Sequence, residues 1–228
     1  MIQAVTPYIL QNLIWIPTQF FLRIFARFDV RGIENLKEIR GGVIFVSNHT
    51  SELDPILLPA SFSLFSRFLP MFYVSREKSF YNPTFLKRLF YGGFFFELWG
   101  AHQTDAGLNN YKLSLKNHIE ILRRGNSLLV FPEGDKSFDG SLHEFKGGAA
   151  YLSHTTGSPI VPVAIKGVFN TSPGSFFTLK HRVTLSFGKP IYPNDFFTGK
   201  TTIEPHDYKI AMNQVVMKEL RTLLASSH

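Results

Sequence analysis

The sequence predicts an α/β domain with a mostly parallel central sheet flanked by helices. Short strand-like runs alternate with helical stretches from about residue 28 onward. Of the 228 residues, 44% are hydrophobic and only 18% are charged, so the chain can form a core and is not intrinsically disordered. No internal repeat or linker divides it. We therefore expect one main domain, residues 28–228, preceded by an N-terminal helical segment, residues 1–27.

The expected elements follow from residue type and periodicity. Strands are expected in seven short apolar runs: 28–33, 43–47, 70–75, 94–98, 127–131, 160–165 and 181–187. Helices are expected between and after them: 55–66, 80–91, 105–123, 145–155 and 205–224. The spacing of Phe62, Phe65 and Phe68 is interpreted as a helix stripe that faces the core, with contact to an acyl chain as the alternative. The proline-containing stretch 190–206 is expected to form a loop.

The N-terminal segment has the pattern of an amphipathic helix with a narrow polar stripe. Residues 1–22 carry no charged side chain, and Pro17 is expected to kink or split the helix. Its polar positions fall four or eight apart: Gln11, Gln19, Arg23 and Arg27. The segment lacks a basic region and a small-residue cleavage site, so we do not expect a secretory signal. Polar residues interrupt each apolar run too early for a good membrane span.

We expect this segment to dock on a membrane surface, with Arg23, Arg27 and Arg31 at the level of the lipid headgroups. Packing against the rest of the domain is the alternative, and a true membrane span is less favoured. A net charge of +7 and 24 Phe residues also suit contact with an anionic lipid surface. Nucleic acid is not expected as a partner, because no basic stripe is interleaved with aromatic residues.

The composition excludes several kinds of site. The chain has no cysteine, which excludes disulfide scaffolds, thiolate metal sites and cysteine nucleophiles. Four histidines lack metal-ligand spacing with carboxylates and are interpreted as surface or packing residues: His102, His118, His143 and His154. Asp135 and Asp139 form too short a ligand series for a calcium site. We therefore expect no metal.

Polar residues follow strand 43–47 directly, at a position where ligand sites of open α/β sheets gather. His49 lies in this turn, and Asp54 with Pro55 has the pattern of a helix N-cap five positions later. A carboxylate that binds one imidazole nitrogen leaves the other free as a general base, which contributes about 10²–10⁴ in rate. A structural role for a turn histidine beside an aspartate is the alternative.

A second group of polar residues follows strand 127–131. Gly134 permits a tight turn, and Lys136 offers a positive charge. The next helix opens at Gly147 and Gly148, where free backbone N–H groups can bind an anion. An ordinary charged surface loop is the alternative for this segment.

Together the two segments resemble the glycerolipid, or lysophosphatidate-type, acyltransferase family. Its first motif, Asn-His-x-Ser-x-x-Asp, is similar to residues 48–54, and its third, Phe-Pro-Glu-Gly, to residues 131–134 with Ser137. Phe145, Lys146 and Gly148 resemble its Phe-Lys-x-Gly motif. Residues 160–163 resemble its fourth motif, residues 30–36 resemble the segment that often precedes the histidine, and the whole resemblance spans residues 28–190.

The resemblance implies an O-acyltransferase that moves a fatty acyl group from a thioester of coenzyme A or acyl carrier protein to the hydroxyl of a lysolipid such as 1-acylglycerol-3-phosphate. It implies that His49 is the base and Asp54 its orienting partner, without a metal, a cofactor or a covalent acyl-enzyme. The implied substrate-binding residues are Asn48, Ser51, Glu133, Gly134, Lys136 and Lys146. It also implies a membrane-associated protein, on the cytoplasmic face.

Three positions depart from the family pattern, and all concern the acceptor. Asp135 and Lys136 stand where the third motif usually has Thr-Arg, and Leu98 stands where the second motif usually ends in Arg. Lysine keeps the positive charge but loses the bidentate fork, and Asp135 would repel a phosphate monoester. Zwitterionic, amino-acid-headed and glycolipid acceptors therefore stay open. Compensating cations could come from Arg76, Lys78 and Lys146.

Two other functions compete with the acyltransferase hypothesis. A hydrolase is disfavoured because the chain has no Gly-x-Ser-x-Gly motif and Ser51 is too close to His49 in sequence to be read as its nucleophile. A non-catalytic peripheral lipid-binding relative is the other alternative, since three motif positions depart from the pattern. Replacement of His49 would distinguish these hypotheses.

Overall fold

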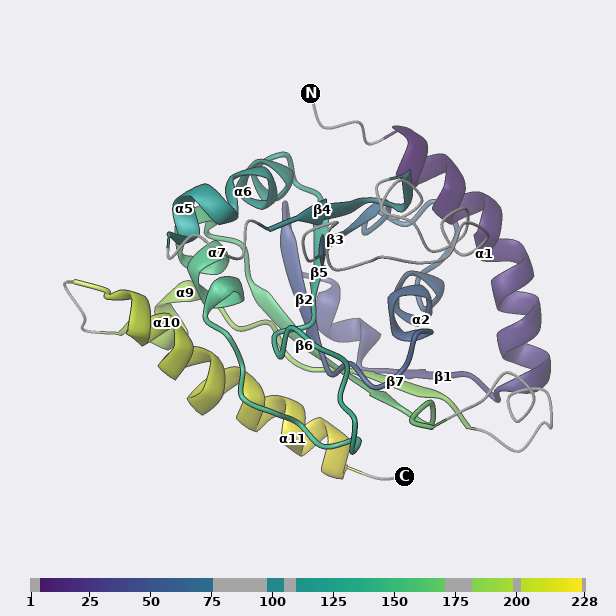
Figure 1. Ribbon diagram of the computed structural model, residues 1–228. Coiled ribbons are helices and arrows are strands. Elements are labelled where there is room, and N and C mark those ends of the chain that lie inside the picture. Colours follow the sequence, from purple (N-terminus) through teal and green to yellow (C-terminus); the bar gives the residue numbers. More distant parts are fainter. Residues whose placement is uncertain (1–4, 76–97, 105–109, 171–181, 199–201, 227–228) are drawn as a thin grey trace, which may run out of the picture.

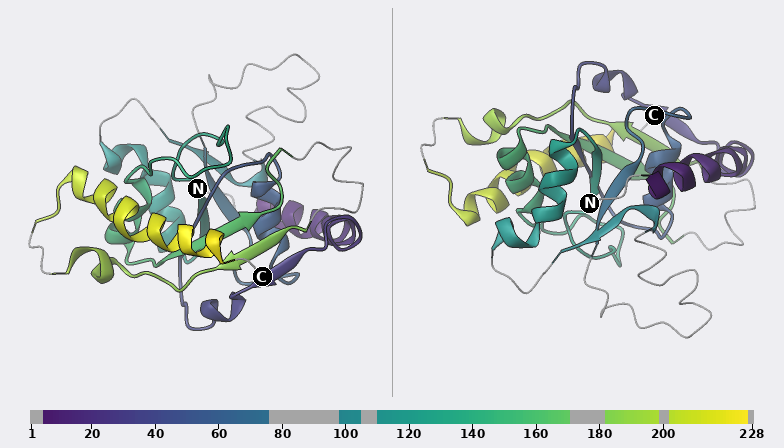
Figure 2. Two further views of the ribbon diagram at one scale, coloured as in Figure 1. Left: turned by 90° about the horizontal axis from the view of Figure 1, so that it is seen from below. Right: turned by 90° about the horizontal axis from the view of Figure 1, so that it is seen from above.

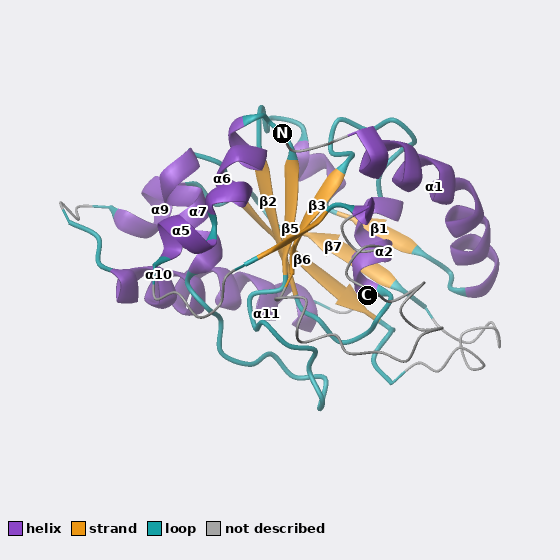
Figure 3. Ribbon diagram, turned by 45° about the horizontal axis from the view of Figure 1, so that its top comes forward, coloured by secondary structure: helices purple, strands orange, loops and turns teal. Residues whose placement is uncertain are grey.

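The structure is a computed structural model that describes residues 5–75, 98–104, 110–170, 182–198 and 202–226. Its centre is a seven-stranded sheet in the order β1-β7-β6-β2-β5-β3-β4 (Figure 3). The strands are β1 (Asp29–Arg31), β2 (Val43–Ser47), β3 (Met71–Ser75), β4 (Ala101–Gln103), β5 (Ser127–Val130), β6 (Ile160–Lys166) and β7 (Thr184–Phe187). Only β6 and β7 pair antiparallel in this described sheet, so β1 and β7 run against the other five strands. The predicted mostly parallel α/β fold is confirmed.

Helices cover both faces of the sheet (Figure 1). One face carries α1 (Val5–Phe25) and α2 (Asp54–Ala60). The other carries α6 (Lys116–Arg123), α7 (Gly148–Thr156), and a C-terminal run of α10 (Pro205–Ala211), a π-helical turn η3 (Met212–Val216) and α11 (Met217–Ala225). The remaining helices are short: η1 (Ile33–Leu36), α5 (Tyr111–Ser114) and α9 (Pro193–Phe197). Both views of Figure 2 place α1 on the rim opposite α10.

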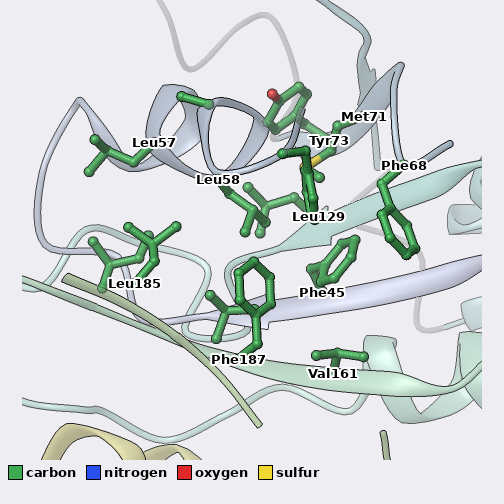
Figure 4. Close-up of a cluster of buried hydrophobic side chains, with 14 of the residues drawn as sticks. Phe45, Leu57, Leu58, Phe68, Met71, Tyr73, Leu129, Val161, Leu185 and Phe187 are labelled. Carbon is green, nitrogen blue, oxygen red and sulfur yellow. The ribbon is translucent and has the colours of Figure 1, made fainter. Parts of the chain in front are cut away.

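The central strand β2 is buried on both faces, which explains why its first four residues, Val43 to Val46, are all apolar. Its side chains alternate between the two layers of the core: Val43 and Phe45 pack on the α2 side, and Ile44 and Val46 on the α7 side. Phe45 contacts other phenylalanine rings at centroid distances of 5.6 to 6.0 Å (Figure 4). Part of the high Phe content is therefore core packing.

Three predicted elements differ from the structure. Helix 55–66 ends at Ala60, and Phe65 lies outside it with a φ of 59° and an exposed side chain, so only Phe62 and Phe68 face the core. The described part of helix 105–123 is interrupted at Leu115, whose φ of −110° and ψ of 13° are not helical. The stretch predicted as a loop, 190–206, contains α9, because Asp195 accepts a hydrogen bond from the Tyr192 N–H at its start.

Helix 80–91 and residues 94–97 of the predicted strand 94–98 lie outside the described residues, and Leu98, the last position of that strand, is helical. The structure adds β4, a three-residue edge strand that the sequence analysis did not predict. Strand β4 pairs with β3. A strand of three residues is too short to show an apolar pattern in the sequence, which explains why it was not predicted. The other strands match the predicted ranges, with β1 and β7 shorter than expected.

Helix α1 runs through Pro17 without being split. Gln11 and Gln19 of its polar stripe face the protein, whereas Arg23 and, beyond the helix, Arg27 are exposed. The Gln11 amide is buried: its Nε2 donates to the carbonyls of Met71 at 2.7 Å and Trp99 at 2.9 Å, and its Oε1 accepts from the Met71 N–H at 2.8 Å. Trp15 Nε1 donates to the Phe62 carbonyl at 2.8 Å, and Gln19 to the carbonyl that ends α2. The polar stripe thus anchors α1 to the domain.

The opposite side of α1 exposes large apolar side chains to the surroundings. Seven are between 43% and 69% exposed: Val5, Ile9, Leu13, Ile16, Phe20, Phe21 and Ile24. Within the described chain, no helix has the length and apolar character that a membrane crossing requires.

Candidate active site

The site begins at the carboxyl end of β2, where His49 and Asp54 meet. The Nδ1 atom of His49 lies 2.9 Å from Oδ2 of the fully buried Asp54. The same oxygen accepts the backbone N–H groups of Thr50 at 2.7 Å and Ser51 at 2.8 Å. Because an ionised carboxylate can only accept, Nδ1 of His49 carries the hydrogen and Nε2 keeps its lone pair. Asp54 is the first residue of α2 rather than its N-cap, which is Leu53, so that part of the sequence interpretation was wrong.

The loop after β5 holds His49 from a second side. The Phe131 ring stacks on the imidazole, with centroids 4.1 Å apart and an interplanar angle of 19°. The Ser137 N–H donates to the His49 carbonyl at 2.7 Å. Asp54 therefore fixes one edge of the imidazole, Phe131 covers one face, and Ser137 fixes the backbone. The His49 side chain remains 19% exposed, which leaves a path to it.

Glu133 lies buried beneath these loops. Its Oε2 accepts the His143 N–H at 3.0 Å, while Oε1 has no hydrogen-bond partner among the described residues. Burial raises the pKa of Glu133, although the hydrogen bond from the His143 N–H opposes that shift. The carboxyl group therefore links two parts of the loop that follows β5.

Asn48 and Ser51 lie beside His49, but their polar atoms are engaged within the fold. The Asn48 amide donates to the Ile165 carbonyl and accepts the Ile165 N–H, both at 2.9 Å, which joins the histidine turn to β6. The Ser51 Oγ accepts the Leu53 N–H at 3.2 Å. In this geometry both residues support the turn. Their predicted contact with substrate stays a prediction.

The two lysines of the predicted site have different partners. Lys136 Nζ pairs with Glu52 Oε1 at 2.6 Å, and both side chains are exposed. The exposed Lys146 lies over Gly134: a Cβ on that glycine would come within 2.5 Å of Lys146 Nζ. Gly134 also has a φ of +83°, a conformation that favours glycine. The structure thus brings Glu133, Gly134 and Lys146 together.

Of the positions that depart from the family pattern, Asp135 is exposed and Leu98 is half-buried in a short helical turn. Arg76 and Lys78 lie outside the described residues. Among the residues that the structure describes, no three His, Asp or Glu side chains gather as metal ligands.

Asn213 of η3 holds the backbone of Phe145, at the start of the segment 145–148. The Asn213 amide accepts the Phe145 N–H at 3.0 Å and donates to the Phe145 carbonyl at 2.8 Å.

Sequence reasoning missed three residues of this site. Glu52 occupies a variable position between motif residues, and only its contact with Lys136 reveals it. Phe131 was noted as part of a motif, but nothing in the sequence places its ring on His49. Asn213 lies 68 positions from its partner Phe145. A polar residue within an otherwise periodic C-terminal helix was the single available signal for it.

Comparisons with known proteins agree with this fold and these motifs. The chloroplastic 1-acyl-sn-glycerol-3-phosphate acyltransferase of Brassica napus is 31% identical over 171 residues, covering 74% of this chain and 46% of the relative. The 1-acyl-sn-glycerol-3-phosphate acyltransferase of Pseudomonas aeruginosa is 29% identical over 142 residues, or 60% of this chain and 49% of the relative. The chain thus spans about half the length of these curated relatives.

Among solved structures, the 1-acyl-sn-glycerophosphate acyltransferase PlsC of Thermotoga maritima superimposes with a TM-score of 0.62 at 21% identity, over 96% of this chain and 83% of that one. This likeness concerns the fold. The sequence model of the family described as Acyltransferase matches residues 27–166, which include the histidine turn and the loop after β5. With the motif residues gathered around His49, this match shows that the chain belongs to the acyltransferase family.

Proposed function

We propose that this protein transfers a fatty acyl group from an acyl thioester, of coenzyme A or acyl carrier protein, to the hydroxyl of 1-acylglycerol-3-phosphate at a membrane surface. The observation that carries this proposal is the His49–Asp54 pair. The hydrogen bond between Nδ1 of His49 and Oδ2 of Asp54 leaves Nε2 of the partly exposed imidazole free. The names of the relatives support the acceptor, since they are 1-acyl-sn-glycerol-3-phosphate acyltransferases.

In the proposed reaction, Nε2 of His49 removes the proton from the acceptor hydroxyl as its oxygen attacks the thioester carbonyl carbon. The tetrahedral intermediate then collapses, the C–S bond breaks, and the thiolate receives the proton from the imidazolium. Asp54 keeps the imidazole in the required tautomer and stabilises the positive charge that forms on it. This sequence produces an ester and a thiol, and it requires no covalent acyl-enzyme.

The acceptor's phosphate is assigned to the two lysines near the histidine. Lys146 is exposed and lies beside Gly134 on the loop that holds His49, so it is available to an anion. Lys136 pairs with Glu52, and a phosphate must compete with that carboxylate for it. Both side chains of this pair are exposed, so water screens it and its strength is about 0–1 kcal/mol. A doubly charged phosphate can therefore displace Glu52.

Helix α1 supports the proposed membrane association. An amphipathic helix in water turns its polar side outward, whereas α1 turns its polar stripe inward and presents seven large apolar side chains. Exposed apolar surface of this extent favours burial in the interfacial region of a bilayer. The charged end of the helix, with Arg23 in the last turn, suits contact with lipid phosphates.

The first test is an acyl-transfer assay on phospholipid vesicles with acyl-CoA and acyl carrier protein as donors. The acceptor panel contains 1-acylglycerol-3-phosphate and lysolipids with zwitterionic, amino-acid and sugar headgroups. His49→Ala should abolish transfer, and His206→Ala, at an exposed position on α10, should not change it. Transfer to another acceptor alone would correct the acceptor assignment. Equal transfer by wild type and His49→Ala would overturn the proposal.

Membrane docking is tested by vesicle flotation. The double variant Leu13→Ser/Ile16→Ser removes two apolar side chains that are 66% and 61% exposed, so the folded domain loses little packing. It should weaken vesicle binding at least tenfold. Leu113→Ser, at a position 56% exposed on α5, is the matched control and should bind as wild type does. Unchanged flotation of the double variant would refute docking by α1.

A further inference from the structure

A row of charged side chains crosses three neighbouring strands at one edge of the sheet. Lys166, the last residue of β6, pairs with Thr184 of β7, and Thr184 pairs with Asp29 of β1. Directly opposed residues project to the same face of a sheet, and so do residues two apart on one strand. Lys166, Asp29 and Arg31 therefore project to the same face.

Positive charge dominates this row. Arg31 Nε and a terminal nitrogen of Arg182 lie 2.8 Å and 3.3 Å from the same oxygen of Asp29. Lys166 Nζ donates to the carbonyl of Ser226, the residue that follows α11, at 2.9 Å. Partial burial, and then the positive charge of Arg31, lower the pKa of Lys166. The two arginines thus share one carboxylate, and Lys166 adds a third cation on the same face. We call Lys166, Arg31 and Arg182 the Lys166 cluster.

The Lys166 cluster lies at the same sheet edge as the candidate active site. Ile165, which precedes Lys166, exchanges two hydrogen bonds with the side chain of Asn48, which precedes His49. Lys166 is two positions after Ala164 on β6, so both side chains project to the same face of the sheet. Ala164 packs in the layer of α7, whereas α2 covers the other face. The cluster is therefore close to His49 along the sheet but displaced from it toward the α11 side.

The strand order separates two groups of cations around His49. His49 follows β2, which lies between β5 and β6 in the sheet. Lys136 and Lys146 come from the loop after β5, on one side, and the Lys166 cluster comes from β6, β7 and β1, on the other. This arrangement suits an acyl transfer between two anionic substrates, because it offers one cationic group for each substrate with the base between them.

We propose that the Lys166 cluster binds the phosphate groups of a coenzyme A thioester, the acyl donor of the proposed function on which this inference rests. In such a donor the long, uncharged pantetheine arm separates the thioester carbon from the phosphates. The phosphates must therefore bind away from His49, and a cation group displaced along the same edge meets this requirement. Arg31 and Arg182 supply planar guanidinium groups suited to phosphate oxygens, and Lys166 supplies a point charge.

The test compares donors that differ only in their phosphates: acyl-CoA, acyl-dephospho-CoA and acyl-pantetheine, each with one acceptor at saturation. Lys166→Gln and Arg31→Gln should each raise the KM for acyl-CoA about tenfold. The KM for acyl-pantetheine and the KM for the acceptor should not change. Lys189→Gln is the control, because Lys189 is exposed and follows β7 at the opposite edge of the sheet. The hydrogen bond from the Gly188 N–H to the Pro162 carbonyl marks that edge.

Each other result overturns the inference. An equal KM increase for acyl-pantetheine would show that these residues act through the fold or the acyl chain. A higher KM for the acceptor, together with weaker binding of the Lys166→Gln variant to anionic phospholipid vesicles, would assign the cluster to lipid headgroups. Wild-type transfer from acyl carrier protein but not from acyl-CoA would overturn this donor site and leave the proposed function standing. Absence of any His49-dependent transfer would instead overturn the proposed function.

Discussion

Replacing Asp54 with asparagine separates the two contributions that its carboxylate makes to His49. Three hydrogens converge on Oδ2, from Thr50 N, Ser51 N and Nδ1 of His49. An asparagine amide must place its oxygen there, because its NH₂ group would face three other donors. The hydrogen bond to Nδ1 and the tautomer of His49 are then retained. The negative charge beside the imidazolium is lost.

The expected loss of activity follows from that missing charge. The positive charge of an imidazolium is spread over its ring, so its centre lies roughly 4 Å from the carboxylate oxygen, given an Nδ1–Oδ2 distance of 2.9 Å. At an effective dielectric constant of about 20, the attraction is about 4 kcal/mol, which corresponds to about 10³ in rate as an upper value. We expect kcat of Asp54→Asn to fall between about 10²- and 10³-fold.

The assay measures kcat and the acceptor KM of Asp54→Asn, Asp54→Ala and His49→Ala, with urea unfolding of each variant. The acceptor KM should not change in Asp54→Asn. Its amide NH₂ takes the place of Oδ1, which is buried without a partner, so stability should fall by about 1–3 kcal/mol. Asp54→Ala leaves two backbone N–H groups without an acceptor and should lose about 2–6 kcal/mol.

Two results would refute this reasoning. If Asp54→Asn keeps its activity to within tenfold, the carboxylate charge contributes little and Asp54 acts by orientation alone. If Asp54→Asn loses as much activity as His49→Ala, the amide has not preserved the geometry of the imidazole, and the convergence of three donors on Oδ2 does not decide its orientation.

Three further predictions concern the surroundings of the site and the core. Phe131→Leu removes the ring stacked on His49, an interaction of about 0.5–1.5 kcal/mol, so kcat/KM should fall about two- to twelvefold in steady-state assays; an unchanged value would refute a positioning role. Glu52→Gln frees Lys136, so the KM for 1-acylglycerol-3-phosphate should fall while that for a zwitterionic lysolipid does not; equal changes would contradict competition by Glu52. Burial lowers the pKa of His118 to about 4, so protonation favours the unfolded chain. Urea unfolding should show constant stability above about pH 6.5 and a loss of up to about 3 kcal/mol from there down to pH 4, and His118→Gln should abolish this loss.

The sequence was sufficient for those features that depend on neighbours along the chain. Strand β2 is apolar from Val43 to Val46, ends at Ser47 and is followed by polar turn residues, so its range was predicted without error. His49 and Asp54 are five positions apart across one turn, which made their contact predictable from spacing. Contacts between distant segments were different: the Phe131–His49 stack spans more than eighty residues, and only the pairing of β2 with β5 brings the two rings together.

Helix α1 shows most clearly where a sequence pattern is ambiguous. Its periodicity establishes a polar stripe and a wide apolar face, but the same periodicity fits a stripe turned toward water and a stripe turned toward the protein. The carbonyls of Met71 and Trp99, at the edge of the sheet, decide between them, because Gln11 satisfies both and also accepts the Met71 N–H. Rotating α1 by half a turn would leave these buried groups without partners, at about 1–3 kcal/mol each. The domain therefore holds the polar side of α1, and the apolar side chains stay exposed, as docking of α1 on a membrane under the proposed function requires.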